Sequence, residues 1–156
     1  MKIALTVNAI ECEMEIEPGE ILLDLLRHSG YKSVKKGCGS GDCGACAVLI
    51  DGRAVNSCLV FAAKADGRTI LTAEGLESDG KLHPIQEAFL EGGAVQCGYC
   101  IPGMEITTLD LLTHNPSPSE EEIREGLSGN LCRCTGYVKQ IEAVKQAAKM
   151  MSGGSR

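Results

Sequence analysis

The spacing of the cysteines limits the possible folds of this chain more than any other feature of its sequence. Eight of the nine cysteines form two groups of four. In the first group, C-x4-C-x2-C is followed by a fourth cysteine after eleven intervening residues: Cys38, Cys43, Cys46 and Cys58. The second group has the spacing C-x2-C, a gap of thirty-one residues, and C-x-C: Cys97, Cys100, Cys132 and Cys134. The fold therefore has to bring together two sets of thiols.

The first group has the ligand spacing of a plant-type 2Fe–2S centre, in which two irons bridged by sulfide take four thiolates. Four glycines lie among these cysteines: Gly37, Gly39, Gly41 and Gly44. Glycine allows a loop to wrap closely around a cluster and to adopt positive φ, and it leaves N–H groups free to point at the sulfurs. A structural zinc site is the alternative, but such sites usually have evenly matched Cys-x2–4-Cys pairs and no glycine wrapping.

The second group is less decisive by spacing alone. Cys97 and Cys100 come just before an expected helix with Pro102 in its first turn, and Cys132 and Cys134 lie between two other expected helices. Four thiolates from two interhelical loops could bind an iron–sulfur cluster or zinc. A redox dithiol formed by Cys97 and Cys100 is a third possibility, although the strand that normally precedes such a motif is not evident.

The net charge and the lengths of the apolar segments disfavour several classes of function. The net charge is −6 and no run of Lys and Arg occurs, which disfavours nucleic-acid binding. The apolar run from Ile3 to Val7 is too short for a signal-peptide core, and no segment of the sequence is long enough to span a bilayer. We therefore expect a cytoplasmic chain, in which cysteines serve as metal ligands more often than as a disulfide framework. Cys12, on the apolar face of an alternating strand, is expected to be a small buried hydrophobe.

Hydrophobic periodicity predicts an α+β chain with two unlike halves. Residues 3–7 and 10–16 predict a strand hairpin, 20–30 a helix, 37–46 a loop, 47–58 a hairpin turning at Asp51-Gly52, and 68–76 a further short strand. Beyond a boundary within residues 74–83, the periodicity predicts helices only. One of them begins with a capping box formed by Ser119 and Glu122. The tail, residues 152–156, is expected to be disordered.

The segments GCGSGDCGAC, AVQCGYCIPGM and GNLCRCTGY resemble the iron–sulfur subunit of the molybdenum hydroxylases, the xanthine oxidase family. The resemblance covers about residues 3–150 and holds all eight grouped cysteines in register. It implies a plant-ferredoxin-like β-grasp domain at residues 1–76 that binds a distal 2Fe–2S cluster through Cys38, Cys43, Cys46 and Cys58. It also implies a four-helix-bundle domain at residues 77–156 that binds a proximal cluster through Cys97, Cys100, Cys132 and Cys134.

The same resemblance implies an electron-transfer subunit of an oxidoreductase, without substrate chemistry of its own. Electrons would pass from a molybdenum–pyranopterin cofactor in a large partner subunit through the two clusters to FAD in a medium partner subunit, within a larger heteromer. Gln96 and Cys134 would also contact the pterin. Two positions depart from the common pattern, namely Ile101, where many relatives have a hydroxyl residue, and Tyr99, where Phe is frequent.

Overall fold

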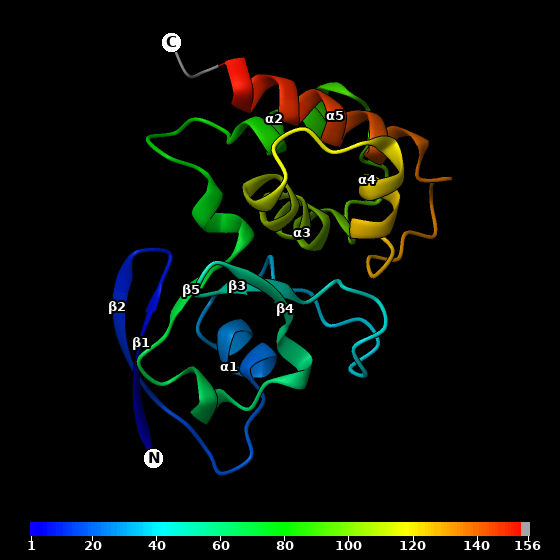
Figure 1. Cartoon of the computed structure of the whole chain (residues 1–156). Helices are drawn as coiled ribbons and strands as arrows, with labels where there is room; N and C mark the ends of the chain where they lie inside the picture. The colour runs from blue at the N-terminus through cyan, green and yellow to red at the C-terminus, as the bar shows by residue number, and fades with distance from the viewer. Residues whose placement is uncertain (154–156) are drawn as a thin grey trace.

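The computed structural model describes residues 1–153 and joins a sheet-containing half to a helical half (Figure 1). The first half contains five strands, β1 Lys2–Val7, β2 Ile10–Glu15, β3 Ala47–Ile50, β4 Arg53–Asn56 and β5 Thr69–Leu71. One α-helix, α1 Leu22–His28, and three short 3-10 helices, η1 Ser57–Leu59, η2 Ala62–Ala65 and η3 Ala73–Leu76, complete it. The helical half contains α2 Pro84–Glu91, α3 Ile101–His114, α4 Glu120–Gly126 and α5 Val138–Gly153. The α+β class predicted from the sequence is confirmed.

The sheet is mixed, and its strand order is β2-β1-β5-β3-β4. The hairpins β1–β2 and β3–β4 are antiparallel, as predicted, whereas β1 and β5 pair in parallel in the middle of the sheet. The strands bury one face because their apolar residues alternate, and α1 contributes its four leucines to the same core. Cys46 and Cys58 belong to this core, so the sheet half holds two thiols of the first group at its apolar centre.

The prediction that Cys12 is buried is wrong in part. Its side chain is only half-buried, and Ile10 on the same strand is 62% exposed. The physical reason is the position of β2, which forms the edge of the sheet and pairs with β1 alone. An edge strand lacks the neighbour that would cover its apolar side chains.

Helices α3 and α4 begin where the sequence predicts, with Pro102 in the first turn of α3. His83 and Ser119 are N-caps of α2 and α4, and each forms a capping box with the residue three positions later. Helices α2 and α5 pack against each other around Phe89, which is fully buried. Ser152 and Gly153, expected in a disordered tail, belong to the end of α5, and residues 154–156 lie outside the described part of the chain. None of the helices within residues 1–153 combines the length and the hydropathy needed to cross a bilayer.

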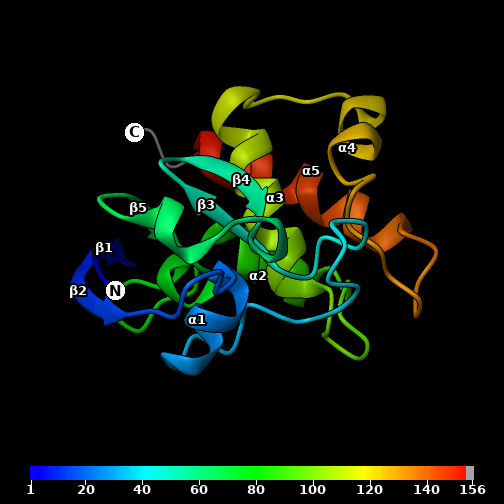
Figure 2. The same ribbon diagram turned by 90° about the horizontal axis from the view of Figure 1, so that it is seen from below.

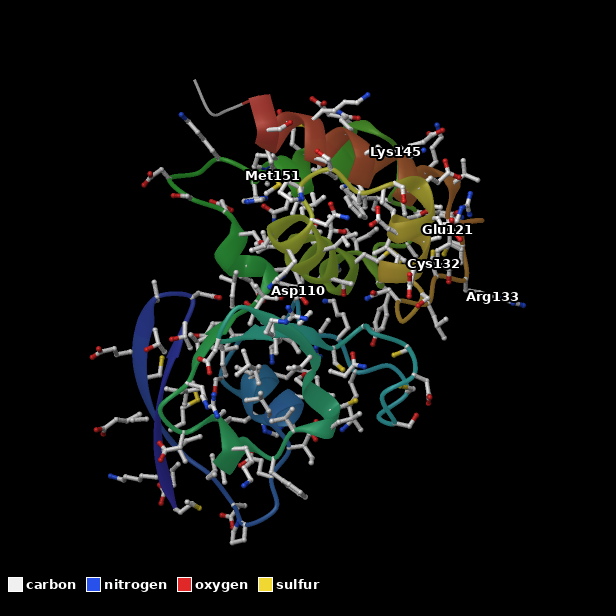
Figure 3. The ribbon with its side chains drawn as sticks, in the orientation of Figure 1. Asp110, Glu121, Cys132, Arg133, Lys145 and Met151 are labelled. Carbon is white, nitrogen blue, oxygen red and sulfur yellow. The ribbon has the colours of Figure 1, made fainter. Side chains whose placement is uncertain are left out.

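Helix α3 joins the two halves, because it lies against β3 and β4 of the sheet in both views (Figures 1 and 2). Ile106 of α3 is fully buried in a separate apolar cluster with Leu49 and Leu76 from the first half. Asp110, labelled in Figure 3, accepts a hydrogen bond from the backbone N–H of Ala54 at 3.1 Å. The halves therefore share a packed boundary.

Glu105 is a buried carboxyl on α3, with only 7% of its surface exposed. Burial raises the pKa of its carboxyl to about 7, although a hydrogen bond with the Gln86 side chain opposes this shift. Because the pKa is higher in the folded than in the unfolded chain, the protonated carboxyl stabilises the fold fully below about pH 4.5. This contribution is lost as the pH rises through about 7.

We expect Glu105→Gln, which resembles the protonated carboxyl, to abolish this loss of stability. Relative to the wild type, it should gain on the order of 2–3 kcal/mol between pH 5 and pH 8. Thermal unfolding of the anaerobic protein measures this as a Tm difference that grows by roughly 5–10 °C over that range. The exposed Glu121 of α4 supplies the control, Glu121→Gln, which should show no such growth. Parallel pH dependence of the Glu105 variant and the wild type would contradict the burial argument.

Candidate metal centres

The first group of cysteines lies on a loop that folds back on itself between α1 and β3. Cys38 and Cys43 belong to the loop, Cys46 directly precedes β3, and Cys58 lies in η1. Gly39, Gly41 and Gly44 have φ of 72°, 88° and 69°. A Cβ on Gly37 would come within 2.6 Å of the Cys43 Sγ. The predicted need for glycine in this loop is therefore confirmed.

The thiols of this group associate in pairs. Cys46 and Cys58 interact through their side chains, and the backbone N–H of Cys38 donates to the Cys43 Sγ at 3.4 Å. The N–H groups of Ser40 and Asp42 donate to the Cys38 Sγ at 3.4 and 3.3 Å. The loop thus directs its N–H groups at sulfur.

The two pairs differ in their electrostatics. Hydrogen bonds from Ser40, with a smaller contribution from Cys43, lower the pKa of the exposed Cys38 thiol to about 6. Burial, followed by the hydrogen bond with Cys46, raises the pKa of Cys58 to about 11. The Cys38 side of the group therefore favours a thiolate near neutral pH. The Cys58 side is an apolar pocket that favours a neutral thiol, or a thiolate whose charge a metal offsets.

The second group combines the segment just before α3 with the segment between α4 and α5. Figure 3 shows Cys132 on the flank of the helical half and the side chain of Arg133 pointing outward from it. The side chains of Cys97 and Cys134 interact, as do those of Cys100 and Cys132. Both contacts run between the two segments, so all four predicted residues come together.

This second group repeats the contrast between exposed and buried thiols. The backbone of Tyr99, and then the Cys134 thiol, lower the pKa of the exposed Cys97. Burial, and then the hydrogen bond with Cys132, raise the pKa of Cys100 to about 12. Burial alone would raise the pKa of Cys132, but the hydrogen bonds from Thr135 outweigh it, so the pKa of Cys132 is lowered.

The contacts between the thiols bear on the alternatives considered above. A structural zinc site gathers four ligands around one ion, whereas a 2Fe–2S centre distributes four thiolates over two irons. A dithiol would pair Cys97 with Cys100, but each of them interacts most strongly with a cysteine of the other segment. Four thiols in each group, with N–H groups directed at the Cys38 Sγ in the first, fit 2Fe–2S centres, and the contacts between the two segments argue against the dithiol.

A polar network that the sequence analysis missed surrounds Cys132. The Thr135 hydroxyl lies 3.2 Å from the Cys132 Sγ and 3.1 Å from the Oε1 of Gln140. Gln140 is fully buried, and its Nε2 donates to the carbonyl of Ala94 at 2.8 Å. The backbone N–H of Cys132 donates to the Tyr137 hydroxyl at 2.7 Å. Thr135 and Tyr137 belong to the segment GNLCRCTGY, but only the contacts with α5 and with Ala94 reveal their role.

The predicted pterin contacts and the two departures from the common family pattern lie in or beside the second group. Gln96 and Cys134, the two predicted pterin contacts, are both exposed, and they are connected through Cys97. Cys100 is the N-cap of α3 and makes no side-chain cap hydrogen bond, with Ile101 at the first helical position. The Tyr99 hydroxyl donates to the carbonyl of Lys36 at 2.7 Å, so the residue that replaces Phe bonds to the other half of the chain.

Comparison with known families agrees with this geometry. Residues 5–76 match the model of a 2Fe-2S iron-sulfur cluster binding domain, and residues 72–145 match that of a 2Fe-2S binding domain. The fold and the sites therefore define a 2Fe–2S iron–sulfur protein, and the predicted ferredoxin-like domain in the first half is confirmed.

Full-length relatives identify the family more closely. The chain is 51% identical to the nicotinate dehydrogenase small FeS subunit of Eubacterium barkeri, with 94% of each chain covered. It is 46% identical to the xanthine dehydrogenase iron–sulfur-binding subunit of Escherichia coli O157:H7, with 92% of each covered. A chain in the crystal structure of quinoline 2-oxidoreductase from Pseudomonas putida 86 superposes with a TM-score of 0.95 at 42% identity, covering 100% of this chain and 98% of that one. The chain belongs to the iron–sulfur subunits of the molybdenum hydroxylases, and is thus a subunit of an oxidoreductase.

We expect Thr135→Val to lower the midpoint potential of the iron–sulfur centre beside Cys132. A hydroxyl that donates to a thiolate stabilises the more negative, reduced centre. Removing a hydrogen bond worth about 0.5–1.5 kcal/mol corresponds to a decrease of roughly 20–65 mV for one electron. A redox titration followed by EPR measures the change, and Thr135→Ser, which keeps the hydroxyl, should retain the wild-type potential. An unchanged potential in the valine variant would show that Thr135 does not act on the centre.

Proposed function

We propose that the chain binds two 2Fe–2S clusters and relays electrons between a molybdenum–pyranopterin site and FAD on partner subunits. The observation that carries this proposal is the gathering of eight thiols into two separate groups of four. The distal cluster is held by Cys38, Cys43, Cys46 and Cys58. The proximal cluster is held by Cys97, Cys100, Cys132 and Cys134.

When bound, a 2Fe–2S centre accepts and releases single electrons. The protein residues act on that property through charge and solvent access. The N–H groups of Ser40 and Asp42 at the Cys38 Sγ offset negative charge on the first ligand set. Cys46 and Cys58, 2% and 8% exposed, keep one side of that set out of water. Cys100, at 8%, does the same for the second set.

The partners follow from the family and from the surface that the cysteines occupy. Relatives of this chain are named as small or iron–sulfur subunits of dehydrogenases, which supports a heteromer with a large molybdenum-binding subunit and a medium FAD-binding subunit. Cys38, Cys97 and Cys134 are exposed, as residues at the faces toward such partners would be. We propose a cytoplasmic location for the complex, because cysteines that serve as metal ligands and not as a disulfide framework are typical of a reducing compartment.

Each half of the chain has one role in this proposal, which is to bind one of the two clusters. We propose that residues 1–76 form a β-grasp domain for the distal cluster, facing FAD, and that residues 77–156 form a four-helix-bundle domain for the proximal cluster. The mixed sheet with α1 packed on it supports the first assignment. The positions of α2 to α5 around one apolar core support the second.

Gln96 and Cys134 face the molybdenum partner in this proposal. Both are exposed beside Cys97, so their side chains are available to a cofactor presented by another chain. The amide of Gln96 offers both a donor and an acceptor to the pterin, and the Cys134 sulfur acts as both an iron ligand and a hydrogen-bond partner.

The ligand assignment predicts a red-brown protein with about four irons per chain. Cys58→Ser and Cys132→Ser should each lose about two of these irons together with one of two EPR signals, because each variant removes a ligand of one centre only. Cys12→Ser is the matched control and should keep all four. A colourless chain that contains zinc, or a ligand variant that loses both centres together, would contradict the assignment.

We expect Gln96→Ala to weaken retention of the pterin cofactor and to slow reduction of the clusters by substrate, while the iron content stays at the wild-type level. The expected decrease in rate is roughly tenfold, the effect of about 1.4 kcal/mol. Stopped-flow absorbance of the purified heteromer measures the rate, and pterin analysis of the same sample measures retention. Wild-type values in both measurements would show that Gln96 does not contact the pterin.

A further inference from the structure

The two cysteine groups are joined by a direct backbone hydrogen bond. The N–H of Leu131 donates to the carbonyl of Cys43 at 2.9 Å. Leu131 precedes Cys132, so this bond connects a ligand of the first group to the neighbour of a ligand of the second. Both views place the loop with the first cysteines beside the segment between α4 and α5 (Figures 1 and 2). A path of covalent bonds and a single hydrogen bond therefore leads from the Cys43 Sγ to the Cys132 Sγ.

A buried side chain holds this contact in place. Asn130 is 3% exposed, and its Nδ2 donates to the carbonyl of Gly44 at 3.3 Å. The same carbonyl accepts from the N–H of Ala47 at 3.1 Å, so both of its lone pairs are used. Because Asn130 is withdrawn from water, solvent does not compete for its amide, and the hydrogen bond fixes the position of one loop relative to the other.

The backbones around this carbonyl leave no space for side chains. A Cβ on Gly44 would lie 2.4 Å from the carbonyl oxygen of Gly129, and a Cβ on Gly103 of α3 would lie 2.2 Å from that of Gly44. Three segments thus meet with backbone against backbone: the first cysteine loop, the start of α3 and the turn before Cys132. Any side chain at these glycines would separate the cysteine groups.

We propose that Asn130 is a positioning residue that sets the separation of the two iron–sulfur sites, by holding the turn before Cys132 against the first cysteine loop. This inference rests on the proposed function. The step that the separation affects moves one electron from a reduced site to an oxidised one and breaks no bond. Tunnelling between the sites weakens steeply with distance, so a larger separation slows it.

The chain offers a matched control for this role. Asn56 also donates its Nδ2 to a glycine carbonyl of the first cysteine loop, that of Gly41, at 2.8 Å. Both ends of that hydrogen bond lie in the first half, so Asn56→Asp alters the loop without affecting the contact between halves. Tyr99→Phe provides a second control, because it removes a hydrogen bond between the halves at a residue that is 48% exposed.

The test uses the full chain with its clusters assembled anaerobically. Iron content and two EPR signals in the wild type examine the proposed function by themselves, and their absence would refute it before any variant is compared. Two readouts then examine the positioning role: the magnetic broadening between the fully reduced sites, and the rate of electron transfer between them after a one-electron pulse, followed by freeze-quench EPR.

We expect Asn130→Asp, which has the same shape but cannot donate, to keep both signals while the broadening decreases. The transfer should slow by roughly tenfold or more, as for small displacements of other positioned groups. Asn56→Asp and Tyr99→Phe should match the wild type. Wild-type broadening and rate in Asn130→Asp, or an equal loss in Tyr99→Phe, would overturn the proposal.

A second variant decides the case in which Asn130→Asp loses a cluster. Gly103→Ala changes no cysteine, and its methyl group must displace the Gly44 carbonyl. Retained clusters with reduced broadening and a slower rate would support the proposal. Wild-type behaviour, or loss of a cluster in this variant as well, would overturn it in favour of a purely structural role.

Discussion

The carbonyl of Gly44 is the point on which the arrangement of the molecule depends. It accepts hydrogen bonds from the sheet half at Ala47 and from the helical half at Asn130, and α3 covers it at Gly103. Both halves have cores of their own, made of aliphatic side chains with few aromatic rings. Such cores could pack against each other in more than one way. The backbone contact at Gly44 selects the arrangement in which the two cysteine groups are neighbours.

Each cysteine group lies where a core meets the surface, and this position combines two requirements. Cys46, Cys58 and Cys100 belong to apolar clusters, which exclude water and anchor one side of each group. Cys38, Cys97 and Cys134 are exposed, which keeps the other side within reach of another protein. A fully buried group could not exchange electrons with a partner, and a fully exposed one would lose its low-dielectric side. The same position accounts for the thiol pKa values: those of the exposed Cys38 and Cys97 are lowered, whereas burial raises those of Cys58 and Cys100.

Local patterns predicted most of the fold because they act over a few residues. The alternation in residues 3–16, the Asp51-Gly52 turn and the capping box at Ser119 each determine their element without help from the rest of the chain. Cys12 shows the limit of such patterns, because alternation does not tell an edge strand from a central one. The cysteine spacing predicted which thiols come together, but not the pairs that they form. Tyr99, Asn130 and Gln140 escaped prediction because their partners lie 63, 86 and 46 residues away.

The network around Thr135 shows how such distant contacts act on the chemistry of a site. Gln140 commits its Nε2 to the carbonyl of Ala94, and therefore presents its Oε1 to Thr135. The threonine hydroxyl has one proton and two acceptors, that oxygen and the Cys132 Sγ. A charged acceptor forms the stronger hydrogen bond, so negative charge on the sulfur draws the proton toward it and away from Gln140. Gln140, buried in the first turn of α5, is thereby coupled to the charge on the Cys132 sulfur, so a residue outside the cysteine motif acts on the chemistry of that group.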